Sequence, residues 1–83
     1  MADKKIGTIT HFYDNISVGI VKLEEPLEKG QKIAIRGNTT DFEQTAESMQ
    51  FDHKDIEKAK AGQEVGLKVD QKVREGDKVF LAE

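Results

Sequence analysis

Three short units built in the same way recur along this chain of 83 residues. They are Gly30-Gln31-Lys32-Ile33, Gly62-Gln63-Glu64-Val65 and Gly76-Asp77-Lys78-Val79. Each unit places a glycine directly before a segment in which apolar and polar residues alternate. Glycine adopts the positive φ angles of tight turns at little steric cost. The units therefore predict three turns, each leading into a β-strand, in an all-β domain.

Alternation of apolar and polar residues predicts six strands, bounded by residues that favour turns. In chain order the strands cover 6–12, 16–23, 32–36, 42–51, 64–69 and 78–81. Six short strands favour a small antiparallel β-barrel, closed or nearly closed, because closure leaves no exposed strand edge. We expect one domain over residues 1–83, with its core between about residues 6 and 81.

Several side-chain positions follow from the strand periodicity. Ile33 and Ile35 should point inward and Ala34 outward, while Met49 and Phe51 should share one face. In 16–23, Val18 and Ile20 should share one face and Val21 and Leu23 the other. This pattern indicates either a strand buried on both sides or a bulge near Gly19. The charged connection 24–29 is expected to turn Leu27 inward, and the spacing of Ile56 and Ala59 predicts a helical turn over 55–61.

Composition excludes several classes of protein. The formal net charge of −3 provides no overall positive field for nucleic acid or an anionic membrane. There is no cysteine, which excludes disulfides and fits a reducing cytoplasm, where we expect the protein to act. No apolar run approaches the roughly 20 residues that span a bilayer, and Met1–Lys5 does not resemble a signal peptide.

Motifs of catalysis are missing from the sequence. It contains no phosphate-binding GxxxxGK[ST], no GxGxxG and no GxSxG. His11 and His53 lie far apart and outside any metal-ligand spacing, and Glu24-Glu25 fits a solvated loop better than an acid–base pair. We therefore expect no enzyme activity, no cofactor and no metal.

Two polar surface segments are candidates for binding. The first runs from Arg36 to Phe42 and combines a guanidinium, an amide, two hydroxyls and an aromatic ring. The contacts expected from it are Arg36, Asn38, Thr39, Thr40 and Asp41. Such a group could bind a phosphate, a sugar or a peptide backbone. A hydroxyl-stabilised turn is the simpler interpretation and stays open.

The second candidate segment contains Gln50, His53 and Lys54, and we expect it to lie near the first. It combines an amide, an imidazole and an ammonium group, which could add hydrogen bonds and local charge to a ligand site. An ordinary exposed strand end is the alternative.

Nearly the whole chain, from about Ile6 to Leu81, resembles the second domain of translational GTPases such as elongation factor Tu. The likeness rests on 55–67, with its Ala-Gly-x-x-Val-Gly pattern, on Gly19-Ile20-Val21 and on 27–35. This resemblance implies a small six-stranded barrel that contacts the aminoacyl end of tRNA. At three positions of that pocket, however, the family's glutamate, arginine and asparagine correspond to Gln50, His53 and Glu64.

A closer likeness is to the C-terminal barrel of collagenase-like peptidase family proteins, some of which are associated with tRNA modification. It is carried by Gly37-Asn38-Thr39-Thr40-Asp41-Phe42 and Ser48-Met49-Gln50. Stand-alone proteins of this kind are described as elongation-factor-like. The 83 residues include neither a peptidase domain nor a GTP-binding domain, so the resemblance implies neither activity.

Two functions are therefore expected. The first is a non-enzymatic module that binds RNA, including tRNA, or a protein of translation or RNA modification. The alternative is a protein–protein module that corresponds to a separately encoded accessory domain of a collagenase-like peptidase or tRNA-modifying enzyme. The acidic balance favours a protein partner over RNA, because an acidic surface gains little from counterion release.

Overall fold

The computed structural model describes residues 4–82, and these residues form ten β-strands and no helix. The strands are β1 (Lys4–Tyr13), β2 (Val18–Leu23), β3 (Leu27–Glu28), β4 (Lys32–Arg36), β5 (Asp41–Thr45), β6 (Met49–Phe51), β7 (Lys54–Ile56), β8 (Lys58–Ala59), β9 (Glu64–Lys68) and β10 (Lys78–Leu81). The expectation of an all-β domain is confirmed. No helix in the described part of the chain is long and apolar enough to cross a membrane.

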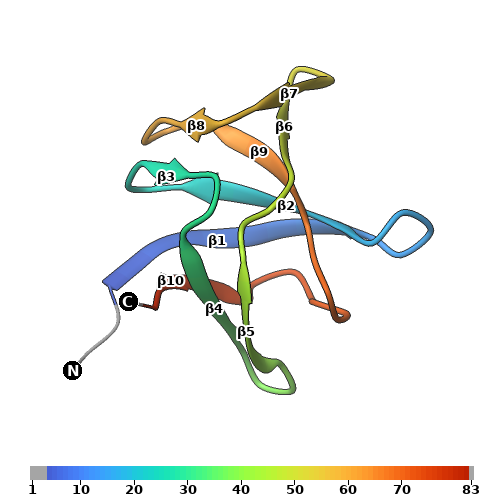
Figure 1. Cartoon of the computed structure of the whole chain (residues 1–83). Helices are drawn as coiled ribbons and strands as arrows, with labels where there is room; N and C mark the ends of the chain where they lie inside the picture. The colour runs from blue at the N-terminus through green and yellow to red at the C-terminus, as the bar shows by residue number, and fades with distance from the viewer. Residues whose placement is uncertain (1–3, 83) are drawn as a thin grey trace.

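Eight of the strands form one sheet in the order β5-β4-β10-β1-β2-β9-β6-β7, and β3 pairs with β8 in a second, two-stranded sheet. Every pairing is antiparallel. The large sheet curls into a half-barrel, with the β4–β5 hairpin at one end and the β6–β7 hairpin at the other (Figure 1). The structure therefore supports a curled antiparallel sheet, and the closed six-stranded barrel stays a prediction.

The concave side of the sheet is filled by one cluster of buried aliphatic side chains. Its largest fully buried members come from β1, β2, β4, β6, β9 and β10, with additional side chains from β3 and from the segment after β9: Ile6, Ile9, Val21, Leu23, Leu27, Ile33, Ile35, Met49, Val65, Leu67, Val73 and Val79. The inward positions predicted for the two isoleucines of β4 and for Leu27 are confirmed. No aromatic ring belongs to the fully buried set, and Phe12 and Phe42 pack against its margin.

The three glycine units form three turns with the same hydrogen bonds. The turns 28–31, 60–63 and 74–77 place Gly30, Gly62 and Gly76 at φ angles of 96°, 88° and 90°. Such angles suit the third position of a type II turn. In each turn the fourth residue donates its backbone N–H to the carbonyl of the first, over 3.2, 3.2 and 3.1 Å. The turns then lead into β4, β9 and β10, as predicted.

A side chain closes each of these turns from the other direction. The Oε1 atom of Gln31 accepts the backbone N–H of Glu28 at 2.8 Å, and Oε1 of Gln63 accepts that of Lys60 at 2.9 Å. In the third turn Oδ2 of Asp77 accepts the N–H of Arg74 at 2.9 Å. The glutamine or aspartate after each glycine therefore fixes the turn, which explains why the repeat extends beyond the glycine.

Gln44 connects the edge strand β5 to the chain that leaves β9. Its Nε2 atom donates to the carbonyl of Lys68 at 2.8 Å, and its Oε1 atom accepts the backbone N–H of Asp70, also at 2.8 Å. The side chain is only 6% exposed. These two bonds imitate the backbone pairing of a neighbouring strand, so this amide holds together an edge that no strand covers.

Three predictions about the strands are wrong. The helical turn over 55–61 is replaced by β7, which forms a hairpin with β6, and by β8, which pairs with β3. The three-residue spacing of Ile56 and Ala59 suggested a helix, but both side chains pack onto the core from strands of different sheets. The expected strand 42–51 is divided at Ala46, whose N–H donates to the carbonyl of Gln31 at 2.9 Å.

The third error is that the connection 24–29 contains β3. Together with β7, β8 and the division of 42–51 into β5 and β6, this strand raises the count from the six expected to ten. Two predicted side-chain positions also differ. Ala34 is fully buried, because its short methyl lies between the longer cross-strand partners Glu43 and Phe80. Phe51 is 38% exposed while Met49 is buried, since β6 ends at Phe51 and the chain turns away from the core.

The bulge expected near Gly19 lies instead across the ladder from that segment. The β1–β2 register shifts between Ile9 and His11 of β1, opposite Val21 and Ile20 of β2. The two faces of β2 are as predicted: Val21 and Leu23 are buried, and Val18 and Ile20 lie half-buried on the outer face.

Candidate functional site

The first predicted binding segment forms the hairpin between β4 and β5. The N–H of Gly37 donates to the carbonyl of Thr40 at 2.7 Å, which leaves Asn38 and Thr39 exposed at the tip. Arg36 Nε lies 3.6 Å from Asp41 Oδ1. Thr40 is 5% exposed, so its side chain faces the protein rather than a ligand.

A groove of about 680 Å³ separates this hairpin from the turn 74–78. Its walls include the cationic side chains of Arg36, Arg74 and Lys78 and the ring of Phe80, over which the Arg36 guanidinium lies at 5.6 Å from the centroid. Two acidic residues also line the groove. Asp77 is 5% exposed and accepts a hydrogen bond within its own turn, and the Glu75 carboxylate lies 3.4 Å from His11 Nδ1. The groove therefore offers guanidinium and ammonium groups from two distant parts of the sequence.

Arg74, Lys78 and Phe80 were not among the predicted binding residues, because they lie some 40 positions after the hairpin that they face. The antiparallel pairing of β10 with β4 brings them together, since Lys78 lies opposite Arg36 and Phe80 opposite Ala34. The third glycine unit was the signal available in the sequence, because it predicted a strand that begins at Lys78. Which strand it would pair with could not be read from local periodicity.

The second predicted segment forms the β6–β7 hairpin, whose turn consists of Asp52 and His53. Both residues have positive φ angles, 55° and 63°, which fits a two-residue turn of type I′. Beside the turn, Gln50 Nε2 donates to Asp55 Oδ1 at 3.1 Å. Lys54 is exposed on β7, the edge strand of the sheet.

The two predicted segments do not form one surface. The β4–β5 hairpin and the β6–β7 hairpin lie at opposite ends of the half-barrel (Figure 1). From the β4–β5 hairpin the chain runs through β5 and then β6 before it reaches the β6–β7 hairpin. The two hairpins are therefore separated by the length of both strands. The expectation that the second segment lies near the first is therefore wrong.

The second segment instead borders a hollow on the outer face of β2, β9 and β6. We call this hollow the Tyr13 patch, with a volume of about 260 Å³ and these lining residues: Tyr13, Ile16, Val18, Ile20, Gln50, Asp52, His53, Glu64 and Gly66. Tyr13 is 51% and Ile16 59% exposed. The three residues aligned with the aminoacyl-end pocket, Gln50, His53 and Glu64, all lie in this patch.

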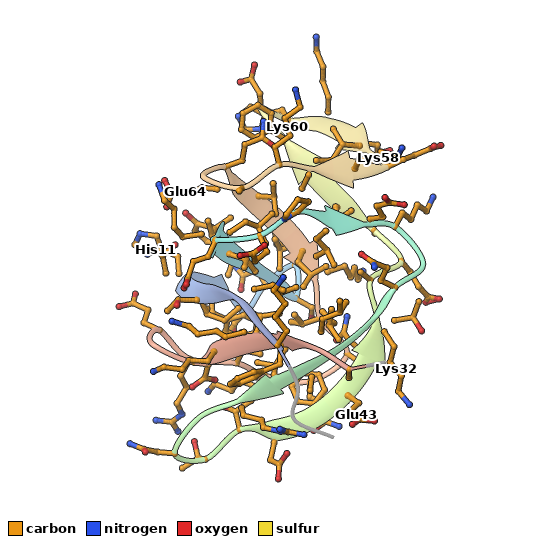
Figure 2. The ribbon with its side chains drawn as sticks, turned by 90° about the vertical axis from the view of Figure 1, so that its left-hand side faces the viewer. His11, Lys32, Glu43, Lys58, Lys60 and Glu64 are labelled. Carbon is orange, nitrogen blue, oxygen red and sulfur yellow. The ribbon has the colours of Figure 1, made fainter. Side chains whose placement is uncertain are left out.

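Residues of β1 make polar contacts along one edge of the Tyr13 patch. Thr10 Oγ1 lies 3.3 Å from the carbonyl of Ile20 and 3.5 Å from Glu64 Oε2. The ring of His11 stacks on that of Tyr13 with centroids 6.3 Å apart, and its Nδ1 atom lies 3.4 Å from Glu75 Oε2. Figure 2 shows Glu64 and His11 extending into solvent on the same side of the molecule.

The described residues contain no group of three or more histidine, aspartate or glutamate side chains placed to hold a metal ion. The two histidines lie in different settings, His11 on β1 beside Glu75 and His53 at the tip of the β6–β7 turn. The described residues present two candidate surfaces, one lined by several cationic side chains and one apolar with an acidic rim.

Comparison with known proteins found one relative by sequence and other relatives by fold alone. No protein-family model matches the chain. Over 78 residues, 93% of its length, it is 45% identical to an uncharacterized protease of Methanocaldococcus jannaschii. The match spans only 19% of that protein's length.

Among solved structures, the chain is similar to the C-terminal domain of a U32-type peptidase of Geobacillus thermoleovorans, with a TM-score of 0.89 at 14% identity. That superposition covers 98% of this chain and 93% of the other. A selenomethionine form of the same domain gives a TM-score of 0.87 at 15% identity. The likeness to domain 2 of elongation factor Tu stays a prediction. The fold of this chain is that of a small β-domain found at the C-terminus of a peptidase.

Proposed function

We propose that this chain is a non-catalytic β-domain that docks onto a partner protein, as an accessory unit of a peptidase-type enzyme. The observation that carries the proposal is the 45% identity to a segment of an uncharacterized protease, most of which lies outside the match. The chain as given spans about a fifth of that relative. A segment of this size in a larger protein supports a role in binding better than a role in chemistry.

The side chains of the chain also favour binding over catalysis. A hydrolase needs a nucleophile or an activated water, together with a base held within hydrogen-bond reach. His11 contacts a glutamate and a tyrosine on an exposed strand end, and His53 stands at a turn tip. Neither arrangement assembles such a pair.

The experiment that tests the proposal is purification of the tagged chain from its source cells, followed by calorimetry with each purified protein that it retains. We expect a stoichiometric complex with a peptidase-type protein and no release of that protein by nuclease. Retention of RNA in place of protein, or of no macromolecule, would contradict the proposal. A peptide-hydrolysis assay of the purified chain alone should give no turnover.

Binding of RNA or tRNA is a second candidate, favoured by one specific observation. Arg74 and Lys78 line the large groove without an acidic side chain within ion-pair distance among the described residues. Cationic side chains of this kind could contact phosphates, with Asn38 and Thr39 donating hydrogen bonds from the opposite wall. On this proposal the contact surface includes the Arg36–Asp41 hairpin, as predicted from the sequence, and also the turn 74–78.

An NMR titration of the isotope-labelled chain with total tRNA separates the two candidates. RNA binding should shift the amides of Asn38, Thr39, Arg74 and Lys78, and the shifts should fade steeply as salt is added. Docking of a protein through apolar contacts should depend little on salt. A spectrum unchanged by tRNA at low salt would remove the RNA candidate.

A further inference from the structure

The Tyr13 patch gathers exposed apolar side chains that would ordinarily be scattered. The large apolar side chains exposed in the described part of the chain are Tyr13, Ile16 and Phe51. Two of the three line this one hollow, and the half-buried Val18 and Ile20 continue the apolar surface between them. Clustering of this kind marks an interaction surface, whereas single exposed apolar residues need no explanation.

Gly66 forms the floor of the hollow. A Cβ atom at this position would lie 3.2 Å from Val18 Cγ1 and 3.8 Å from Ile20 Cδ1, so any side chain would fill the space between the two. The volume of about 260 Å³ is below the range of roughly 300–1,000 Å³ typical of small-molecule sites. The hollow is therefore of a size to take one or two side chains of a partner.

Both turns beside the hollow have a strained backbone. Ser17, Asp52 and His53 are the non-glycine residues with positive φ in the described chain, at 55°, 55° and 63°. A residue with a Cβ atom adopts this conformation only at a steric cost. Such strain persists where the surrounding structure imposes it and often accompanies a functional surface. Ile16 precedes Ser17 in one of these turns, His53 belongs to the other, and both line the hollow.

The charges of the patch limit what can bind there. Its ionisable lining consists of the carboxylates of Asp52 and Glu64 and the imidazole of His53, with no lysine or arginine. A second copy docked by two-fold symmetry would face the same patch and bring like charges together. A partner that supplies lysine or arginine would instead neutralise both carboxylates.

We propose that the Tyr13 patch binds an aliphatic segment of a partner protein that carries lysine or arginine side chains. An aliphatic side chain lies over Gly66 between Val18 and Ile20, and flanking cations approach Asp52 and Glu64. The inference rests on the proposed docking function and adds the surface and the chemistry of the partner.

The test uses two acetylated hexapeptides as probes, one alternating lysine with leucine and one alternating glutamate with leucine. Each is titrated into the isotope-labelled full chain and followed by NMR. We expect the lysine peptide to shift the amides of Tyr13, Ile16, Val18 and Gly66, with an affinity roughly tenfold above that of the glutamate peptide. Glu64→Gln should weaken binding of the lysine peptide, whereas the matched control Glu47→Gln, at an exposed acid outside the patch, should not.

A second pair of variants tests the apolar half of the contact. Ile16→Ser should abolish the shifts, while Phe51→Ser, which also removes an exposed apolar side chain but outside the hollow, should retain them. Equal affinity for the two peptides, no shift at millimolar peptide, or concentration-dependent shifts that reveal a dimer would each overturn the inference. If a purified partner binds the chain equally well after Ile16→Ser and Glu64→Gln, this inference fails while the docking function stands.

Discussion

Replacement of Gln44 by methionine tests whether one side chain holds the uncovered edge of the half-barrel. Methionine has a similar length and flexibility but cannot form the two hydrogen bonds of 2.8 Å to Lys68 and Asp70. The buried position of Gln44 favours an apolar replacement, so the cost should come from the carbonyl and the N–H left without partners.

The expected cost is about 2 kcal/mol. A buried group left unsatisfied costs about 1–3 kcal/mol, and water can reach the partly exposed segment after β9 and replace part of the loss. For a domain of this size the total stability is about 4–12 kcal/mol, so this loss is a large fraction. With a shift of roughly 4–8 °C per kcal/mol, the melting temperature should fall by about 8–16 °C.

Thermal unfolding followed by circular dichroism measures this change, and amide hydrogen exchange should show faster exchange at Asp70. Gln71→Met is the matched control, because Gln71 is an exposed glutamine in the same segment and should change the unfolding free energy by no more than about 0.5 kcal/mol. A Gln44→Met variant that melts with the wild-type protein would refute the proposed role of this amide.

Four further predictions concern the turns and the Tyr13 patch. Gly62→Ala should lower the unfolding free energy by about 1 kcal/mol through backbone strain alone, since no atom lies within 4 Å of the added methyl, and Ala61→Ser should be near neutral in the same denaturant titration. Gly37→Ala should cost about 1–3 kcal/mol in that assay, because the methyl would overlap the carboxylate of Asp77; unchanged stability would contradict this packing. Asp77→Ala should destabilise the protein by about 1 kcal/mol and Asp77→Asn by less, since the amide oxygen can still accept the N–H of Arg74, so equal losses would exclude that bond as the cause. Ile16→Ser should leave the melting temperature within experimental error, because that side chain is 59% exposed, and a large drop would show that it supports the fold.

The parts of the fold predictable from sequence were those governed by local chemistry. The three glycine units specified their turns because a positive φ angle and the following glutamine or aspartate both act within four residues. Alternation placed Ile33, Ile35, Val65 and Leu67 inward, because each belongs to a strand with one face on the core. The short strands β3 and β8 escaped prediction, since two residues carry no periodicity and their pairing joins segments some 30 positions apart.

For the candidate surfaces, too, the sequence predicted the local features but not those that depend on strand pairing. The composition of the Arg36–Asp41 hairpin marked it as a turn rich in polar groups, and the structure adds the opposite wall of its groove through the pairing of β10 with β4. The Tyr13 patch could not be predicted, because the turn that carries Tyr13 and Ile16 is brought to Gly66 only by the pairing of β2 with β9. The positive φ angles of Asp52 and His53 gave only a weak signal, since aspartate and histidine adopt such angles more often than most residues but less readily than glycine.

On our proposal, this β-domain docks a partner protein onto the Tyr13 patch. The most direct measurement is the NMR spectrum of the isotope-labelled chain bound to the partner protein that copurifies with it. The proposal predicts that signals of Tyr13, Ile16, Val18 and Gly66 broaden or shift while those of Asn38, Thr39 and Lys78 stay in place. Shifts confined to the groove between the β4–β5 hairpin and the turn 74–78 would contradict the proposal.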